Sequence, residues 1–191
     1  MYYDFWNEAN EPKLLEKLGF TQVDLKPAII SAKTVNEVKN LTGKNKDADF
    51  IILHKPNEAV LKAAVQECGI DATDAFVEYP LIMKLSERNI AVILSFNELL
   101  NADSARFSKL IYLMARTVRL CRKYKVPLMI ASGASDKYSQ RSVSELIAFG
   151  ENLGMTAGES KETLFRHQNK ILERNKLKKA GKWIYSGVQV V

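Results

Sequence analysis

The sequence has few residues of the kinds that build a metal centre. Histidine occurs only at His54 and His167, more than a hundred residues apart, and in neither an H-x-H nor an H-E-x-x-H motif. A metal-dependent phosphoesterase needs clustered histidine and carboxylate ligands. Asp4, Asp71 and Asp74 follow predicted strands and offer carboxylates for Mg²⁺, but residues in such places are more often helix caps. We therefore assign no metal ligand.

Cysteine, long apolar runs and nucleophile motifs are also scarce. Cys68 and Cys121 both fall in helical patterns, which favours buried free thiols over a disulfide. No apolar run reaches about 18 residues, and the first ten residues do not resemble a secretory signal. We expect a cytoplasmic protein without membrane contact. The loop at residues 132–135 has neither a G-x-S-x-G nor a P-loop pattern, so no catalytic residue is assigned.

Acidic residues are scarce in the second half of the chain. Residues 1–102 carry 11 Lys and Arg against 15 Asp and Glu, whereas residues 103–191 carry 17 against 7. The helical pattern at residues 103–125 contains seven Lys and Arg and one acid, Asp103. A solvated outer face is the simpler explanation, but such faces usually mix both signs. The asymmetry favours a surface that meets a polyanion such as RNA.

Short apolar runs alternate with helical patterns along the chain. Strands are expected at residues 2–5, 20–25, 29–30, 50–53, 71–76, 90–94 and 126–131, and helices at residues 10–18, 34–41, 57–68, 80–88, 103–124, 142–154 and 158–175. About six or seven strands alternating with helices predict a compact, irregular TIM-like (β/α) barrel. This single domain would span residues 1–175. Residues 176–191 would form a basic C-terminal tail that is an edge strand, a docking arm or disordered.

Small, polar and basic residues follow the predicted strands. The run at residues 126–131 leads into Ser132-Gly133-Ala134-Ser135, with Lys137 and Arg141 close behind. The ends of parallel strands are where α/β folds place their binding sites, and this loop offers hydroxyls and backbone N–H groups for phosphate. The alternative is that this loop is a plain turn without a binding role. For Arg141 the alternative is a structural role, an i,i+4 pair with Glu145.

Several segments resemble a known family. They are residues 89–95 with Glu98-Leu99-Leu100, residues 123–126, residues 131–134 with Lys137 and Arg141, Glu145-Leu146-Ile147 with Gly150, and Gly154-Met155. Together they resemble protein component 3 of archaeal ribonuclease P, a family shared with eukaryotic RNase P and RNase MRP. The likeness covers roughly residues 1–172. Gly133 replaces a usual serine, Leu94 an aromatic residue, and Ser142 lacks a neighbouring proline.

The resemblance implies a barrel related to the polymerase-and-histidinol-phosphatase barrels, but without their metal site. It implies a subunit of a ribonucleoprotein whose RNA removes the 5′ leader from precursor tRNA. Mg²⁺ would be held by that RNA, with no cofactor on this chain. The partners would be the ribonuclease P RNA and other protein subunits, one forming a direct pair with this chain, and precursor tRNA would be the substrate of the complex.

The residues expected to contact RNA are basic side chains that lie at the ends of predicted strands or on predicted helices. They are Lys55, Arg106, Lys109, Arg116, Lys137, Arg141, Lys161 and Arg166. The alternative function is a stand-alone metal-dependent phosphoesterase or nuclease on a TIM-like barrel. A third interpretation is a barrel whose basic face has no function.

Overall fold

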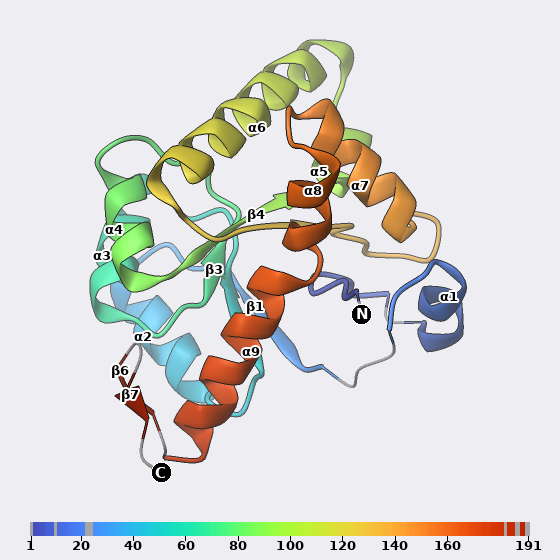
Figure 1. Cartoon of the computed structure of the whole chain (residues 1–191). Helices are drawn as coiled ribbons and strands as arrows, with labels where there is room; N and C mark the ends of the chain where they lie inside the picture. Colours follow the sequence, from blue (N-terminus) through green and yellow to red (C-terminus); the bar gives the residue numbers. More distant parts are fainter. Residues whose placement is uncertain (1, 10, 22–24, 182, 186–187, 190–191) are drawn as a thin grey trace.

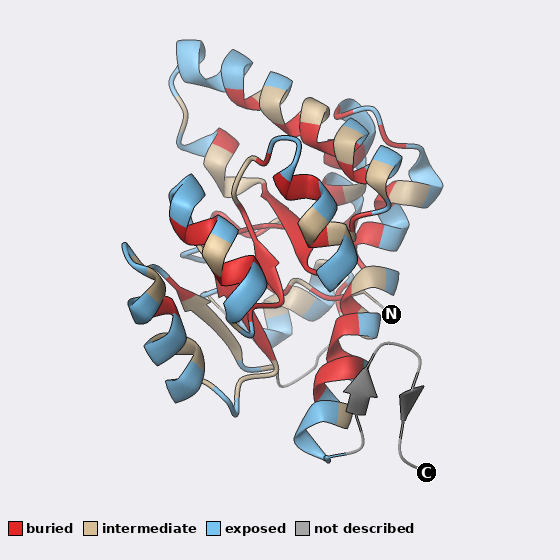
Figure 2. Ribbon diagram, turned by 90° about the vertical axis from the view of Figure 1, so that its left-hand side faces the viewer, coloured by how far each residue is buried: buried red, intermediate tan, exposed pale blue. Residues whose placement is uncertain are grey.

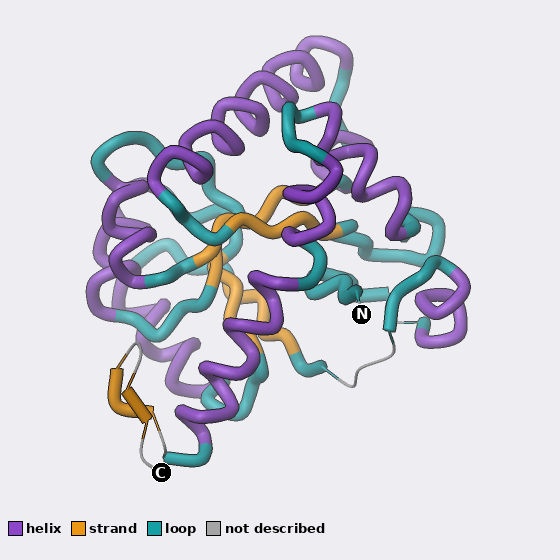
Figure 3. Tube along the Cα trace, viewed as in Figure 1, coloured by secondary structure: helices purple, strands orange, loops and turns teal. Residues whose placement is uncertain are grey.

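A parallel sheet forms the centre of the computed structural model, which describes residues 2–9, 11–21, 25–181, 183–185 and 188–189. The sheet has the strand order β1-β2-β3-β4-β5, and helices surround it (Figures 1 and 3). The strands β2, β4 and β5 are buried at every position, as expected for parallel strands covered on both faces. The five strands are β1 (Pro27–Ile30), β2 (Phe50–Leu53), β3 (Ala72–Thr73), β4 (Ala91–Ser95) and β5 (Leu128–Ala131).

The helices begin where the sequence supplies caps. Thr34, Ser142 and Thr156 each form a capping box with the glutamate three residues on, and Asn57 and Asp103 accept a backbone N–H with their side chains. The helices are α1 (Pro12–Lys17), α2 (Val35–Lys44), α3 (Glu58–Glu67), α4 (Leu81–Arg88), α5 (Asn97–Leu100), α6 (Ser104–Tyr124), α7 (Val143–Asn152), α8 (Ala157–Thr163) and α9 (Arg166–Lys179).

The sheet separates two apolar cores, because alternate side chains of each strand point to opposite faces. Leu53, Val92 and Ile130 point outward into the larger core under the surrounding helices. Phe50 and Ile93 point into the smaller inner core, together with aromatic residues of the N-terminal segment and with apolar residues of α9. Figure 2 shows the buried strands at the centre and α9 with its buried face against them. The helix α9 thus fills the inside of an incomplete barrel.

The N-terminal segment extends the sheet beyond β5 without forming a regular strand. Asn7 makes an isolated parallel bridge with Ala134, the N–H of Glu8 donates to the carbonyl of Ala134 (2.8 Å), and the N–H of Gly133 donates to the carbonyl of Trp6 (2.9 Å). The expected strand at residues 2–5 is therefore wrong in detail. The segment still occupies the place of a barrel strand next to β5.

Two other expectations fail for identifiable reasons. Phe20 and Thr21 lie in the turn after α1, and β1 begins at Pro27, since proline is tolerated as the first residue of an edge strand. Residues 22–24 of the expected strand at 20–25 lie outside the described residues. The expected helix at residues 158–175 is two helices, α8 and α9. It breaks at Leu164, which is fully buried and whose carbonyl accepts the N–H of Tyr3 (3.2 Å).

The end of the chain carries a short antiparallel pair. The helix α9 runs to Lys179, and β6 (Trp183–Tyr185) pairs with β7 (Val188–Gln189) rather than with the parallel sheet. Residues 182, 186–187 and 190–191 of the expected tail lie outside the described residues. Among the helices that the structure describes, none has the length and apolarity needed to cross a membrane.

Candidate nucleic-acid interface

The carboxyl ends of the strands meet the N-terminal segment around a polar hollow of about 270 Å³. Lys55 after β2, Ser95 at the end of β4 and Gly133 after β5 all line it. So does Arg106, from the first turn of α6. The structure therefore brings Lys55 and Arg106 together, although they are 51 positions apart in the sequence. This end of the sheet is the place where α/β barrels bind ligands.

A histidine–aspartate pair supports one side of the hollow. His54 Nδ1 lies 2.7 Å from Asp74 Oδ2, and the other carboxylate oxygen of Asp74 accepts the backbone N–H of Lys55 at 2.7 Å. Asp74 thereby holds Lys55 in a left-handed conformation with φ of 43°. The Lys55 ammonium lies 3.2 Å from Glu98, so its charge is already partly balanced.

This pair was missed at the sequence level. A signal for it existed, because His54 and Asp74 each directly follow a strand and those strands are neighbours. Asp71, which the sequence analysis grouped with Asp74, precedes β3 and therefore lies at the opposite end of the sheet. The three carboxylates considered as Mg²⁺ ligands and then not assigned, those of Asp4, Asp71 and Asp74, are thus not all at one end of the sheet.

Asp4 fastens the N-terminal segment to the end of β5. Its carboxylate accepts the backbone N–H of Ser132 at 3.0 Å. Burial raises the pKa of Asp4 to about 6, although the hydrogen bonds from Ser132 act in the opposite direction. The described contacts of this carboxylate involve neutral donors, which explains why burial dominates its titration.

The loop between β5 and α7 approaches β4 closely at Gly133. Its φ is +65°, and a Cβ there would lie 2.0 Å from the Ser95 hydroxyl oxygen, so only glycine fits. Farther along, the Asp136 carboxylate accepts the N–H groups of Tyr138 and Ser139, at 2.7 and 3.0 Å. These backbone hydrogen bonds hold the pKa of Asp136 below its usual value. The loop that carries Lys137 and Arg141 is therefore built around specific turn contacts.

Lys137 and Arg141 make different contacts within this loop. The Lys137 ammonium lies 5.0 Å from the centre of the exposed Tyr138 ring. Arg141 lies 5.2 Å above the Phe96 ring and donates to the carbonyls of Tyr138 (3.0 Å) and Gln140 (2.7 Å). Among the ion pairs of the described residues, none joins Arg141 to Glu145, whose carboxylate instead accepts the N–H and hydroxyl of Ser142. Arg141 thus has a structural role through the Phe96 ring and these carbonyls. The N–H of Ser142 and, to a smaller extent, the charge of Arg141 lower the pKa of Glu145.

The remaining predicted RNA contacts fall into two groups. Arg106 and Lys109 flank a shallow hollow of about 510 Å³ on the first turns of α6, and Arg116, farther along the same helix, pairs with Glu78 at 3.0 Å. Lys161 lies on α8, and Arg166 at the start of α9 pairs with Glu162 at 3.0 Å. The structure therefore separates a rim-and-α6 group from an α8–α9 group.

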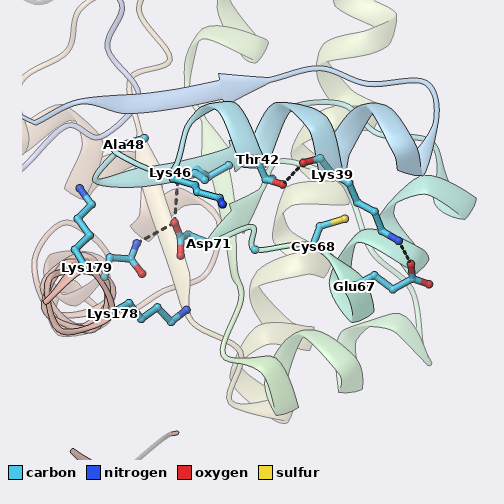
Figure 4. Close-up of a pocket in the computed structure, with 13 residues that line it drawn as sticks. Lys39, Thr42, Lys46, Ala48, Glu67, Cys68, Asp71, Lys178 and Lys179 are labelled. Carbon is cyan, nitrogen blue, oxygen red and sulfur yellow. Dashed lines mark hydrogen bonds and ion pairs between the residues drawn. The ribbon is translucent and has the colours of Figure 1, made fainter. Parts of the chain in front are cut away.

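A second large hollow lies at the amino end of the sheet and is also basic (Figure 4). It measures about 500 Å³, and Lys39, Lys46, Lys178 and Lys179 line it. Lys39 pairs with Glu67 at 2.6 Å, and Lys179 pairs with Asp49 at 2.8 Å, so part of this charge is balanced within the protein. Burial and the nearby Arg174 lower the pKa of Lys178.

The cysteines follow the sequence analysis in part. Both cysteines are free thiols; Cys121 is buried, which raises its pKa to about 12, and Cys68 is half-buried. In the parts of the chain that the structure describes, no three side chains of His, Cys, Asp or Glu gather in a way that could hold a metal ion.

Comparison with known proteins identifies the family. The family model for RNase P subunit p30 matches residues 28–180 of this chain. The chain belongs to this family. The α/β, barrel-like fold and the family expected from the sequence are thus confirmed.

Curated members of the p30 family are similar over most of the chain. Ribonuclease P protein component 3 of Methanosarcina mazei is 28% identical over 149 residues, which cover 74% of this chain and 62% of the relative. The protein of the same name from Thermococcus gammatolerans is 27% identical over 158 residues, covering 83% and 73%. The chain thus spans less than two thirds of the length of the Methanosarcina mazei relative.

Solved structures share the fold. A chain in the cryo-EM structure of archaeal ribonuclease P with mature tRNA superposes with a TM-score of 0.77 at 19% identity, covering 91% of this chain and 78% of that one. A crystal structure of an uncharacterised protein superposes with a TM-score of 0.58 at 12% identity, covering 86% and 47%. At these identities the likeness concerns the arrangement of helices and strands.

Proposed function

We propose that this p30-family chain is a protein subunit of a ribonuclease P ribonucleoprotein and supports RNA-catalysed removal of the 5′ leader from precursor tRNA. The observation that carries the proposal is the family match over residues 28–180. The names of the curated relatives support it, as does the solved ribonuclease P that contains a chain of this fold. The chain's partners would be the ribonuclease P RNA and other protein subunits, one of them in a direct pair. Precursor tRNA would be the substrate of the complex.

Within this particle the chain binds and does not cleave. The proposed RNA contacts are the cations of the rim and α6, namely Lys55, Arg106, Lys109, Arg116, Lys137 and Arg141, together with Lys161 and Arg166 on the α8–α9 side. Such cations neutralise phosphates and position the RNA without reading its sequence. The chain carries no cofactor, and Mg²⁺ belongs to the RNA. The cytoplasmic location expected from the sequence is part of this proposal.

Reconstitution with ribonuclease P RNA, the other protein subunits and precursor tRNA tests the proposal. We expect no cleavage by the purified chain alone, and faster cleavage when it joins the RNA and the remaining proteins. Leaving this chain out of the full mixture is the matched control. Mg²⁺-dependent cleavage by the chain without RNA would instead support the metal-dependent phosphoesterase or nuclease.

A further inference from the structure

The outer face of α6 carries one exposed aromatic ring among cations. The opposite face of the helix is buried through Leu110, Met114, Val118 and Cys121, among others. Tyr112 lies on the solvent side and is 62% exposed. Residues three and four apart are neighbours on a helix surface, so Lys109 and Arg116 lie one turn to either side of it, and Arg119 lies one turn beyond. No acidic residue occurs between Ser104 and Tyr124.

Tyr112 differs from the other strongly exposed tyrosines. Tyr79 is 64% exposed and packs against Tyr124 with ring centres 5.7 Å apart, and Tyr138 is 80% exposed and lies beside the Lys137 ammonium. Tyr112 makes neither kind of contact with any described residue. Its ring therefore presents an open face.

The helix that carries the ring is held at both ends. Asp103 caps its start, and Arg122 near its end donates to both carboxylate oxygens of Glu159 (2.7 and 2.9 Å) and to the carbonyl of Gly154 (2.9 Å). Glu78 holds Arg116 at 3.0 Å. A ring on a rigid support loses little conformational entropy when a partner binds.

We propose that Tyr112 stacks on an unpaired base of the RNA, while Lys109 and Arg119 contact the flanking phosphates. This inference rests on the proposed function and assigns a residue outside the cations predicted from the sequence. Single-stranded nucleic acid is bound by aromatic platforms set among cations, because every base has a π-face and every linkage carries a charge. A protein partner fits this face less well, since the centres of protein interfaces are depleted in lysine and charge.

The dissociation constant of the full chain for ribonuclease P RNA, measured over a series of salt concentrations, tests this. Tyr112→Ala should weaken binding by about 5- to 150-fold, the range of losing one stacked base, without changing the salt dependence. Tyr112→Phe should bind like the wild type, and Tyr112→Leu like Tyr112→Ala, because stacking needs the ring. Lys109→Gln should instead lower the salt slope by roughly one counterion. A fully paired RNA duplex should bind the wild type and Tyr112→Ala equally.

Several results would overturn the inference. One is full RNA affinity in Tyr112→Ala or Tyr112→Leu, and another is an equal loss of affinity in the control Tyr79→Ala. A third is a Tyr112→Ala variant that binds RNA normally but no longer associates with a protein subunit. The last would make this face a protein interface. Thermal unfolding should show that Tyr112→Ala is as stable as the wild type, because the side chain is exposed. A wild-type chain that does not bind the RNA would defeat the proposed function itself, whereas a wild type that binds beside an unaffected Tyr112→Ala defeats only this inference.

Discussion

The helices α6 and α9 contain six Lys and Arg residues each, but they use these charges in opposite ways. On α6 the buried side chains are mainly apolar, and the cations lie on other sides of the helix. The buried side chains of α9 include Gln168, Arg174 and Asn175. A count of basic residues on a helix therefore does not tell whether they are available to RNA.

The difference follows from what each helix packs against. The helix α6 covers the outer core, where it meets apolar side chains. The helix α9 crosses the inside of the sheet and reaches its amino end, where polar groups of the strand starts need partners. There the Asp71 carboxylate accepts the N–H of Ile51 (2.9 Å), the Asn175 amide (2.9 Å) and the Arg174 guanidinium, which also donates to the carbonyl of Asn89 (3.1 Å). Arg174 is needed there to neutralise a buried carboxylate.

Replacing the buried cation of α9 should have the largest effect on stability. Arg174→Ala leaves Asp71 buried without its charge partner and should lower the free energy of unfolding by about 3 to 5 kcal/mol. The matched change on α6, Arg119→Ala, should stay within about 0.5 kcal/mol, because Arg119 is exposed. Urea denaturation measures both. Equal losses in the two variants would remove the distinction between the helices.

Asp4 is a second carboxylate, partly buried, that accepts hydrogen bonds from neutral donors, whereas Asp71 is paired with Arg174. Because its folded pKa of about 6 lies above the ordinary aspartate pKa of 3.8, its protonated form is favoured in the folded state. The resulting stability is complete below pH 3.8 and is lost as the pH rises through 6, on the order of 2 kcal/mol in total. Asp4→Asn should flatten this part of the curve of unfolding free energy against pH. A wild-type curve that does not fall between pH 4 and 7 would contradict the assignment.

Arg122 is the α6 cation that we expect to act within the protein rather than on RNA. Its hydrogen bonds lower the pKa of Glu159 to about 2 from the ordinary glutamate pKa of 4.5. A depressed acid pKa stabilises the fold above pH 4.5, and this contribution disappears as the pH falls toward 2. Since the pair is partly exposed, Arg122→Ala should cost about 1 kcal/mol at pH 7. The difference in unfolding free energy between variant and wild type should disappear as the pH falls toward 2. A difference that does not depend on pH would argue against the ion pair.

The smallest effect concerns RNA binding by single exposed lysines. Lys109→Gln on α6 should lower the slope of log affinity against log salt by roughly one, because one phosphate contact is lost. Lys170→Gln on α9 is the matched control and should leave the slope unchanged, because Lys170 is not among the proposed RNA contacts. A lower slope in the control alone would mean that Lys170, and not Lys109, contacts the RNA.

Local sequence determined most helices and the best-buried strands. The starts of the helices near Asn57, Asp103 and Ser142 were correctly predicted, and in the structure these side chains accept the first N–H groups of their helices. The strands β2, β4 and β5 could be predicted from their continuous apolar runs, because strands buried on both faces have no polar alternation. The pattern around β3 predicted the strand but not its short length of two residues.

Tertiary structure alone decided where the charged side chains and the aromatic rings lie in the folded protein. Asp71 and Arg174 are separated by 103 positions, and His54 and Asp74 by 20, so each pair forms only when the sheet brings its partners together. The break at Leu164 depends on the outer core, in which this side chain is buried, and the inward course of α9 depends on the inner core. No local pattern encodes either core. The basic character of α6 and the presence of Tyr112 are properties of the sequence. That the ring faces solvent among cations, while Arg174 is buried, follows from which side of the sheet each helix covers.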